Sequence, residues 1–188
     1  MIILASGSPR RKQLLTEAGV EVVTEPANID EQVKPAEAPH AYALRMAQEK
    51  AHAVAKHHIN EQIRIVSADT SVILDGQILG KPESEAQAYE MLSHLSGRSH
   101  EVLTGVCVLD VQHQREHSFV SETRVHFTQL SPERIWAYIR TGEPMDKAGA
   151  YGIQGRAASF VSRIEGSYTN VVGLPLCETI EALDVINN

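Results

Sequence analysis

A pair of arginines stands where a helix is expected to begin. Residues 1–5 predict an apolar strand, and Ser8-Pro9 suits the N-cap and first position of a helix. Unpaired N–H groups give a helix N-terminus partial positive charge, so Arg10 and Arg11 are disfavoured there unless an anion lies among them. The small residues at 6–8 let an anion reach the backbone, and arginine suits forked contacts to phosphate. The segment is therefore consistent with either a phosphate site or a solvated pair of surface arginines.

An acid follows a strongly apolar segment. Residues 63–68 predict a buried strand, and Asp69-Thr70 comes directly after it. Ligands of open α/β sheets bind where strands end, so Asp69 is a candidate site residue. The simpler interpretation is a turn-forming aspartate that caps a hairpin, because Asp75-Gly76 after residues 72–74 predicts a hairpin returning through residues 78–79.

Two lysines and a loop acid complete the charged candidates. Lys81 lies in Gly80-Lys81-Pro82, whose spacing from Gly76 and whose proline both exclude a P-loop. Lys50 falls inside a helix expected over 41–57, and Glu31 falls in the loop before that helix. By residue type alone, Lys50 and Glu31 are both expected to be solvated.

Composition limits the class of protein. The chain has 188 residues, 43% of them hydrophobic, which suits a single domain, 1–188, of ordinary size. The net charge of −7 opposes general nucleic-acid binding, which needs a broad basic face. No apolar run approaches the ~20 residues of a membrane span, and the N-terminus lacks signal-peptide features. The chain is therefore expected to be cytoplasmic and to bind neither membranes nor nucleic acids.

Cysteines and histidines give no metal site by spacing. Cys107 and Cys177 are far apart, without a C-x-x-C pattern, and are expected to be buried thiols. The nine histidines have no spacing typical of a tetrahedral site and are expected to be solvated.

Strand and helix signals alternate along the chain, which favours an α/β fold. Further helices are expected from Ser84 to Gly97, after Ser131-Pro132 and after Pro175. Further strands are expected near 101–110, 118–128 and 159–164, with a glycine-rich loop at 149–155. The helix over 41–57 is expected to bury Leu44, Ala47, Ala51 and Val54.

Ordered blocks along nearly all of the chain resemble the Maf family of nucleotide pyrophosphatases. The blocks are Ser6-Gly7-Ser8-Pro9-Arg10-Arg11, Asp30-Glu31, Gln48-Glu49-Lys50-Ala51, Ser67-Ala68-Asp69-Thr70, Gly80-Lys81-Pro82, residues 146–155, Gly166-Ser167-Tyr168 and Val172-Gly173-Leu174-Pro175. The resemblance implies an α/β fold like that of the inosine triphosphate pyrophosphatases, with an elongated mixed sheet flanked by helices and two lobes around a central cleft. It also implies a cytoplasmic homodimer that needs a divalent metal, Mg²⁺ or Mn²⁺, and acts on a nucleoside triphosphate.

The same resemblance implies roles for individual positions. Asp69 matches the catalytic acid or base, and Glu31 matches a cleft acid that helps to place the metal. Positions that hold phosphates are matched by Ser6, Lys50 and Lys81, and positions tied to base choice are matched by Arg11, Thr70 and Gln154. Arg10 or Arg11 supplies a further cation, since a triphosphate needs its charge absorbed while water is aligned for attack. Asp69 either activates the water directly or holds the metal, and the sequence leaves both roles open.

The residues 150–155 resemble the branch of the family that acts on dTTP and UTP more than the branch that acts on 7-methyl-GTP. Ser67 is a small departure, where the first branch often has glycine. The expected activity is hydrolysis of dTTP and UTP to the monophosphate and pyrophosphate, extending to modified nucleotides. The alternatives are a 7-methyl-GTP pyrophosphatase and a non-catalytic regulator of septum formation, whose sequence support would be loss of the acid or the cations.

Overall fold

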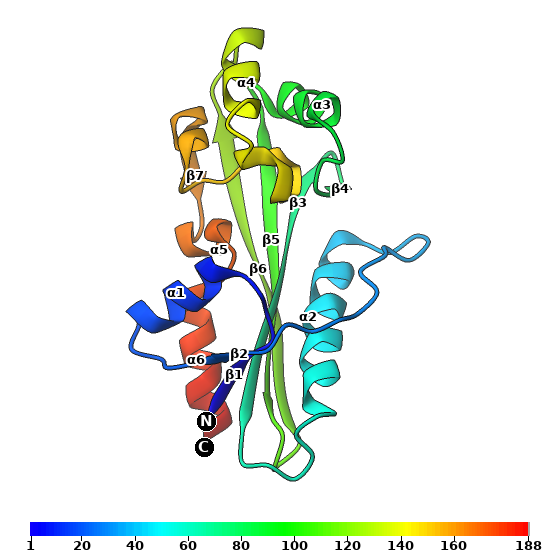
Figure 1. Ribbon diagram of the computed structural model, residues 1–188, viewed down its shortest axis with the longest axis vertical. Helices are drawn as coiled ribbons and strands as arrows, with labels where there is room; N and C mark the ends of the chain where they lie inside the picture. The colour runs from blue at the N-terminus through cyan, green and yellow to red at the C-terminus, as the bar shows by residue number, and fades with distance from the viewer. Residues whose placement is uncertain (188) are drawn as a thin grey trace. The chain divides into compact units, whose positions relative to one another are not determined.

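Helices and strands alternate along the chain, as the α/β prediction requires. The computed structural model describes residues 1–187 (Figure 1). The strands are β1 (Ile2–Leu4), β2 (Val23–Thr24), β3 (Arg64–Leu74), β4 (Gln77–Leu79), β5 (Ser99–Asp110), β6 (Arg115–Phe127) and β7 (Val161–Glu165). The helices are α1 (Pro9–Glu17), α2 (Pro39–Ala55), α3 (Glu85–Leu95), α4 (Pro132–Ile139), α5 (Tyr168–Val172) and α6 (Leu176–Asn187). Short 3-10 helices span Glu143–Asp146, Ala148–Ala150 and Arg156–Phe160.

The strands form one mixed, seven-stranded sheet. Its order is β2-β1-β3-β5-β6-β7, and β4 pairs with β3 off this row. Strand β1 is parallel to both β2 and β3, whereas β3 with β4 and β6 with β7 are antiparallel. The prediction of a mixed sheet flanked by helices is therefore confirmed. Among residues 1–187, no helix combines the length and the apolar character needed to cross a membrane.

The described residues divide into two compact units. Unit 1 contains Met1–Thr70, Thr104–Ser121 and the described residues from Gly173 onward. Unit 2 contains Ser71–Leu103 and Glu122–Val172. Strands β3, β5 and β6 each contribute residues to both units. The single domain over 1–188 stays a prediction, and its last residue, Asn188, lies outside the described residues.

In unit 1, α2 covers one face of the strands, and α1 and α6 lie on the other face (Figure 1). Buried side chains of α2, β1, β3, β5 and the residues next to β1 and β3 form one core cluster: Ile3, Ala5, Ala47, Ala51, Val54, Ile63, Ile65, Cys107 and Leu109. The small alanines of α2 recur at helical spacing, so the helix packs closely on the sheet. The predicted buried face of α2 is confirmed at Ala47, Ala51 and Val54, whereas Leu44 is half-buried.

In unit 2, aromatic side chains form much of the packing. Tyr89 of α3 stacks on Trp136 of α4, with ring centroids 4.9 Å apart. Phe127 meets Tyr151 edge to face at 4.8 Å, and His100 donates to or accepts from the Tyr151 hydroxyl at 2.7 Å. His100 is 3% exposed, so the expectation that the histidines are solvated is wrong at this position. Burial lowers the pKa of His100 to about 4, which keeps the ring neutral at physiological pH.

Asp69 lies within a strand and not at the end of one. The expected strand over 63–68 and the hairpin strand at 72–74 are a single strand, β3. Asp69 caps no hairpin, because the turn falls at Asp75-Gly76, where both residues have positive φ (51° and 76°). A polar residue is tolerated inside β3 because its carboxylate has an ion-pair partner.

Two smaller predictions also change, and two elements were not predicted. The strand expected over 159–164 begins only at Val161, since residues 156–160 form a 3-10 helix. Cys177 is an exposed free thiol on α6, because it lies on the outer face of that helix, while Cys107 is buried as expected. The two-residue strand β2 and the short helix α5 have no counterpart among the predicted elements.

Candidate active site

The end of strand β1 is the place where most of the predicted site residues meet. The last β1 residue, Leu4, pairs with Val66 of β3, and the next amide, Ala5 N, donates to the Val66 carbonyl at 2.8 Å. Strand β3 continues further, so Asp69 and Thr70 extend past the end of its neighbour. Ligands bind where parallel strands end, and here the strand that ends is β1. The sequence analysis placed Asp69 after a strand, whereas Asp69 lies inside β3, beyond the point where the neighbouring β1 ends.

Arg11 connects three segments of unit 1. Its Nε donates to the Gly173 carbonyl at 2.7 Å, its Nη1 to Ser6 Oγ at 3.1 Å and its Nη2 to Thr70 Oγ1 at 3.1 Å. Thr70 Oγ1 also lies 2.9 Å from Thr104 Oγ1. Burial lowers the pKa of Arg11, an effect that the negative charge of Asp69 opposes. The guanidinium is therefore fixed by acceptors of the chain, and it is not a solvated surface group.

The start of α1 carries a second arginine. Ser8 caps the helix, its Oγ accepting from the Arg11 amide, and Ser6 Oγ accepts from the Ser8 amide at 3.2 Å. Arg10 is half-buried and, within residues 1–187, forms no ion pair. Its positive charge lowers the pKa of the neighbouring Arg11. Two adjacent cations at a helix N-terminus make this a favourable place for an anion.

Lys50 joins two carboxylates. It is 9% exposed, and its Nζ lies 2.7 Å from Asp69 Oδ1 and 2.7 Å from Glu31 Oε1. The expectation of a solvated lysine is therefore wrong, because the α2 position of Lys50 faces β3. Asp69 is also 9% exposed, and among residues 1–187 its second oxygen, Oδ2, accepts no hydrogen bond. That oxygen is available to a water or a cation.

The carboxylates of Glu31 and Asp69 fit a divalent metal ion. Both donate hard oxygen ligands, and both already converge on one cation, the Lys50 ammonium. Within residues 1–187 no group of three or more His, Cys, Asp or Glu side chains is arranged to hold an ion. Two protein carboxylates with waters and substrate phosphates suit Mg²⁺, which seldom uses an all-protein cage.

The remaining two predicted residues belong to unit 2. Lys81 follows β4, and Gln154 lies in the turn after Ile153; both side chains are exposed. The segments that carry them are joined, because the Gly149 amide donates to the Gly80 carbonyl at 3.0 Å. Gly149 has a positive φ of 66°, and a Cβ there would lie 2.9 Å from Val72 Cγ1, so this contact requires glycine.

Sequence reasoning missed two participants in unit 1. The Gly173 carbonyl accepts from Arg11, and Thr104 contacts Thr70. Gly173 appears in the sequence only as part of a resemblance block, and no side-chain pattern marks a backbone acceptor. Its φ of +129° is the feature that favours glycine, and that feature is visible only in three dimensions.

Asp69 is mostly buried and contacts the Lys50 ammonium, and its negative charge acts on the Arg11 guanidinium. The model of the family described as "Maf-like protein" matches residues 1–186. The chain belongs to the Maf family.

Three similar relatives are each named dTTP/UTP pyrophosphatase. The relative from Syntrophomonas wolfei is 53% identical over 92% of this chain and 90% of its own length. The relative from Geobacter sulfurreducens is 52% identical over 97% of this chain and 94% of its own. The relative from Acinetobacter baylyi is 49% identical over 96% of each.

Two solved structures are more distant. One is a nucleoside-triphosphatase, dITP/XTP pyrophosphatase, from Mycobacterium abscessus, 17% identical over 69% of this chain and 75% of its own, with a TM-score of 0.42. The other is the Staphylococcus aureus Ham1 protein, 15% identical over 67% of this chain and 71% of its own, with a TM-score of 0.47.

Proposed function

We propose that this chain is a nucleoside triphosphate pyrophosphatase, a hydrolase acting on acid anhydrides, that converts dTTP and UTP to the monophosphate and pyrophosphate. The observation that carries the proposal is Asp69 of β3, which Lys50 contacts at one carboxylate oxygen while the other accepts no hydrogen bond from the part of the chain that the structure describes. Relatives near 50% identity over nearly the full length share the named activity, which supports the choice of pyrimidine substrate.

The reaction adds water to the α-phosphorus. This attack breaks the bond between the α-phosphorus and the oxygen that bridges it to the β-phosphorus. The electron pair of that bond leaves on pyrophosphate. Asp69 either accepts the proton of the attacking water or holds the cation that activates it. Lys50 and Arg11 in unit 1, with Arg10, Ser6 and Lys81, bind the phosphates and absorb their charge.

A divalent cation, Mg²⁺ or Mn²⁺, is part of the proposal. Glu31 and Asp69 would hold it, since their carboxylates converge within one cation's reach. When bound, such an ion neutralises phosphate charge and lowers the pKa of a coordinated water. Lys50 then keeps the two carboxylates oriented while it contacts a phosphate oxygen.

The activity is tested with purified protein, Mg²⁺ and a panel of dTTP, UTP, CTP, ATP, GTP, 7-methyl-GTP and modified pyrimidine triphosphates. We expect monophosphate and pyrophosphate in equal amounts, with dTTP and UTP hydrolysed fastest. In ¹⁸O-labelled water, the label is expected in the monophosphate, because attack at the α-phosphorus places the water oxygen there. Label in pyrophosphate, or preference for 7-methyl-GTP, would overturn the proposed reaction or the proposed substrate.

Gln154 is proposed to recognise the base, together with Thr70. A glutamine amide offers both a donor and an acceptor, so an amide held in one orientation can donate to a carbonyl and accept from N3–H of uracil or thymine, whereas cytosine, which has no N3–H, would need the opposite orientation. Gln154→Ala is expected to lower kcat/KM for UTP and dTTP more than for CTP, because a wrong pairing leaves polar groups unsatisfied. Equal losses on every nucleotide would show that Gln154 supports the loop without choosing the base.

The proposed assembly is a cytoplasmic homodimer that binds neither nucleic acid nor membrane. The net charge of −7 supports the absence of nucleic-acid binding. Light scattering on the purified chain measures its mass, and a mass of one chain would contradict the dimer.

A further inference from the structure

A long segment carries Glu31 to the site without regular structure of its own. Residues 25–38 lie outside any helix or strand, between β2 and α2. Segments of this length lacking helix or strand are usually functional or mobile. Glu31 itself is exposed, yet its carboxylate reaches Lys50 at 2.7 Å. Some other contact must therefore keep the segment on α2.

Helix α2 supplies that contact through Arg45. The guanidinium forms a two-pronged ion pair with Glu37, at 2.5 Å from Nε to Oε1 and 2.7 Å from Nη2 to Oε2. Its Nη2 also donates to the Gln32 carbonyl at 3.0 Å. The side chains of Arg45 and Glu37 are only 16% and 9% exposed, so this pair is better shielded than an ordinary surface ion pair. Arg45 thus binds both ends of the 32–37 stretch.

Tyr42 anchors the segment one helical turn earlier. Its hydroxyl donates to the Glu31 carbonyl at 2.9 Å, and its ring lies under the Arg45 guanidinium at 5.6 Å. Tyr42 is 8% exposed, which fixes the position of the hydroxyl. The hydrogen bond holds the backbone of the very residue whose carboxylate meets Lys50.

The turn that presents Glu37 is strained. Ala36 has a φ of +58°, a conformation unfavourable for a residue with a Cβ. The turn is closed by a hydrogen bond from the Glu37 amide to the Lys34 carbonyl at 3.1 Å, and Glu37 Oε2 accepts from the Lys34 amide at 2.9 Å. The pairing with Arg45 lowers the pKa of Glu37 to about 2, so this carboxylate stays charged over the working range of pH. The ion pair holds the strained turn in place.

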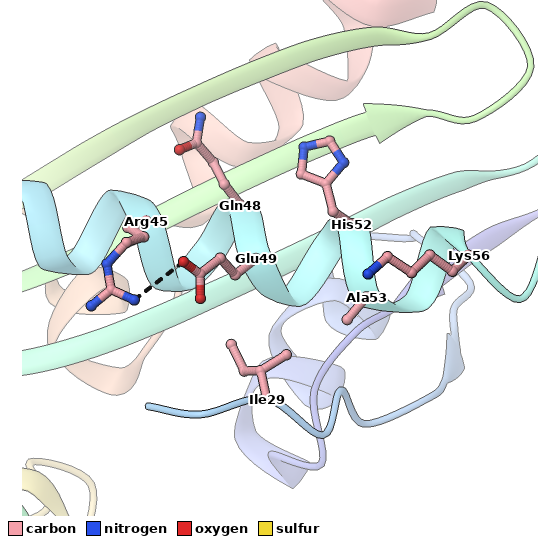
Figure 2. A pocket seen from close by; sticks show the side chains of 7 residues that line it. All are labelled: Ile29, Arg45, Gln48, Glu49, His52, Ala53 and Lys56. Carbon is pink, nitrogen blue, oxygen red and sulfur yellow. Dashed lines mark hydrogen bonds and ion pairs between the residues drawn. The ribbon is translucent and has the colours of Figure 1, made fainter. Parts of the chain in front are cut away.

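Figure 2 shows the face of α2 that carries Arg45, followed toward the C-terminal end of the helix. Arg45 and Glu49 point toward each other at one end of a hollow of about 490 Å³, and Ile29 faces α2 from the segment before Glu31. The segment therefore lies along α2 on both sides of Glu31: before it, Ile29 lines the hollow together with α2 residues, and after it, Arg45 binds Gln32 and Glu37.

We propose that Arg45 is a positioning residue: with Tyr42 and Glu37, it holds residues 31–37 against α2 so that the Glu31 carboxylate stays beside Lys50 and Asp69. Arg45 acts through Glu31 and does not itself touch the substrate. The inference rests on the proposed function for its effect on catalysis, but the contact between Arg45 and the segment does not depend on that function.

The test uses the full chain with Arg45→Lys, Glu37→Gln and Tyr42→Phe. Lysine keeps the charge but cannot form the two-pronged pair, and phenylalanine keeps the buried ring but lacks the hydroxyl. Each variant is expected to speed amide hydrogen exchange in peptides covering 31–37. Arg45→Lys is also expected to lower kcat/KM by roughly 10- to 100-fold, because losing a residue that orients a metal-binding side chain usually has an effect of that size. The matched control is Glu116→Gln, which removes a negative charge that contacts Gln48 and His52 on α2 and alters no contact to the segment. This control should change neither quantity more than about twofold.

A double-mutant cycle separates positioning from general loss of stability. If Arg45 acts through Glu31, Arg45→Lys costs little further kcat/KM once Glu31→Gln is present. Losses that multiply, or exchange that is unchanged in all three variants, would overturn the inference. If the wild-type chain hydrolyses no nucleoside triphosphate, the proposed function fails, and the exchange data still decide whether Arg45 holds the segment.

Discussion

Asp69 is the residue on which the proposed chemistry depends most directly. Its carboxylate contacts Lys50 at one oxygen, the other oxygen accepts no hydrogen bond from residues 1–187, and its charge acts on the buried guanidinium of Arg11. Replacing the carboxylate by an amide keeps the shape but removes proton acceptance, and it weakens metal binding because a neutral amide oxygen replaces a charged one. Either open role of Asp69 therefore requires the charge.

Asp69→Asn is expected to lower kcat on dTTP by about 10² to 10⁴, the range for losing a general base. Circular dichroism checks that the variant is folded, since Lys50 loses one partner but keeps Glu31. The matched control is Asp75→Asn in the exposed turn after β3, where asparagine also accepts the positive φ. A folded Asp69→Asn protein with near wild-type kcat would remove Asp69 from the reaction.

At the scale of elements, local signals predicted the starts of α1, α3 and α4, whereas contacts distant in sequence were not predicted. Ser8, Ser84 and Ser131 each cap a helix by accepting from the amide three residues on, as their spacing indicated. The Asp75-Gly76 turn was equally local. The pairing of Lys50 with Asp69 is not local, and the sequence did not predict it, because nothing in residue type shows that α2 faces β3 there. The resemblance to a family supplied those site roles, and residue chemistry alone favoured solvated side chains.

The packing of α2 on β5 depends on a missing side chain. A Cβ at Gly105 would lie 2.0 Å from the Ala43 carbonyl oxygen, which is backbone and cannot rotate away. Gly105→Ala is expected to destabilise the protein by about 1 to 3 kcal/mol, the usual cost of overpacking. Urea unfolding measures this, with Gly80→Ala as control because a Cβ there meets nothing within 4 Å. Equal stabilities of the two variants would contradict close packing at Gly105.

The loop after β2 is joined to the end of α2 by a pH-sensitive contact. Glu25 lies 2.8 Å from both His57 and His58. Hydrogen bonds to these histidines lower the pKa of Glu25 below its ordinary 4.5, and the hydrogen bond to Glu25 raises the pKa of His58 above 6.5. The contribution of Glu25 to the free energy of unfolding is lost as pH falls through its lowered pKa. The contribution of His58 is lost as pH rises through its raised pKa.

Glu25→Gln should therefore reduce the free energy of unfolding most between about pH 4.5 and 6.5, where both partners are charged. The groups are partly exposed, so the difference is at most about 1 kcal/mol. Urea unfolding of both proteins from pH 4 to 9 gives the difference at each pH. A difference that does not vary with pH would mean that the contact contributes no charge–charge stabilisation.

At the scale of the whole molecule, the open point is whether two compact units behave as one domain. Each of β3, β5 and β6 passes from one unit to the other without interruption, at residues 70–71, 103–104 and 121–122. Separate domains are usually joined by linkers that few contacts cross, whereas here three hydrogen-bonded strands are shared. Unfolding one unit would therefore disturb strands that continue into the other.

We therefore expect the chain to unfold in a single transition, as the single-domain prediction requires. The chain offers one probe in each unit: Trp136, its sole tryptophan, lies in unit 2, and the exposed Cys177 in unit 1 accepts a thiol-reactive dye. Cys107 stays unlabelled in the folded protein, because it is buried and burial raises the pKa of its thiol to about 12. Tryptophan fluorescence, dye fluorescence and far-ultraviolet circular dichroism should then give the same urea midpoint. A Trp136 midpoint clearly separated from the Cys177 midpoint would show that the two units unfold independently and that the chain contains two domains.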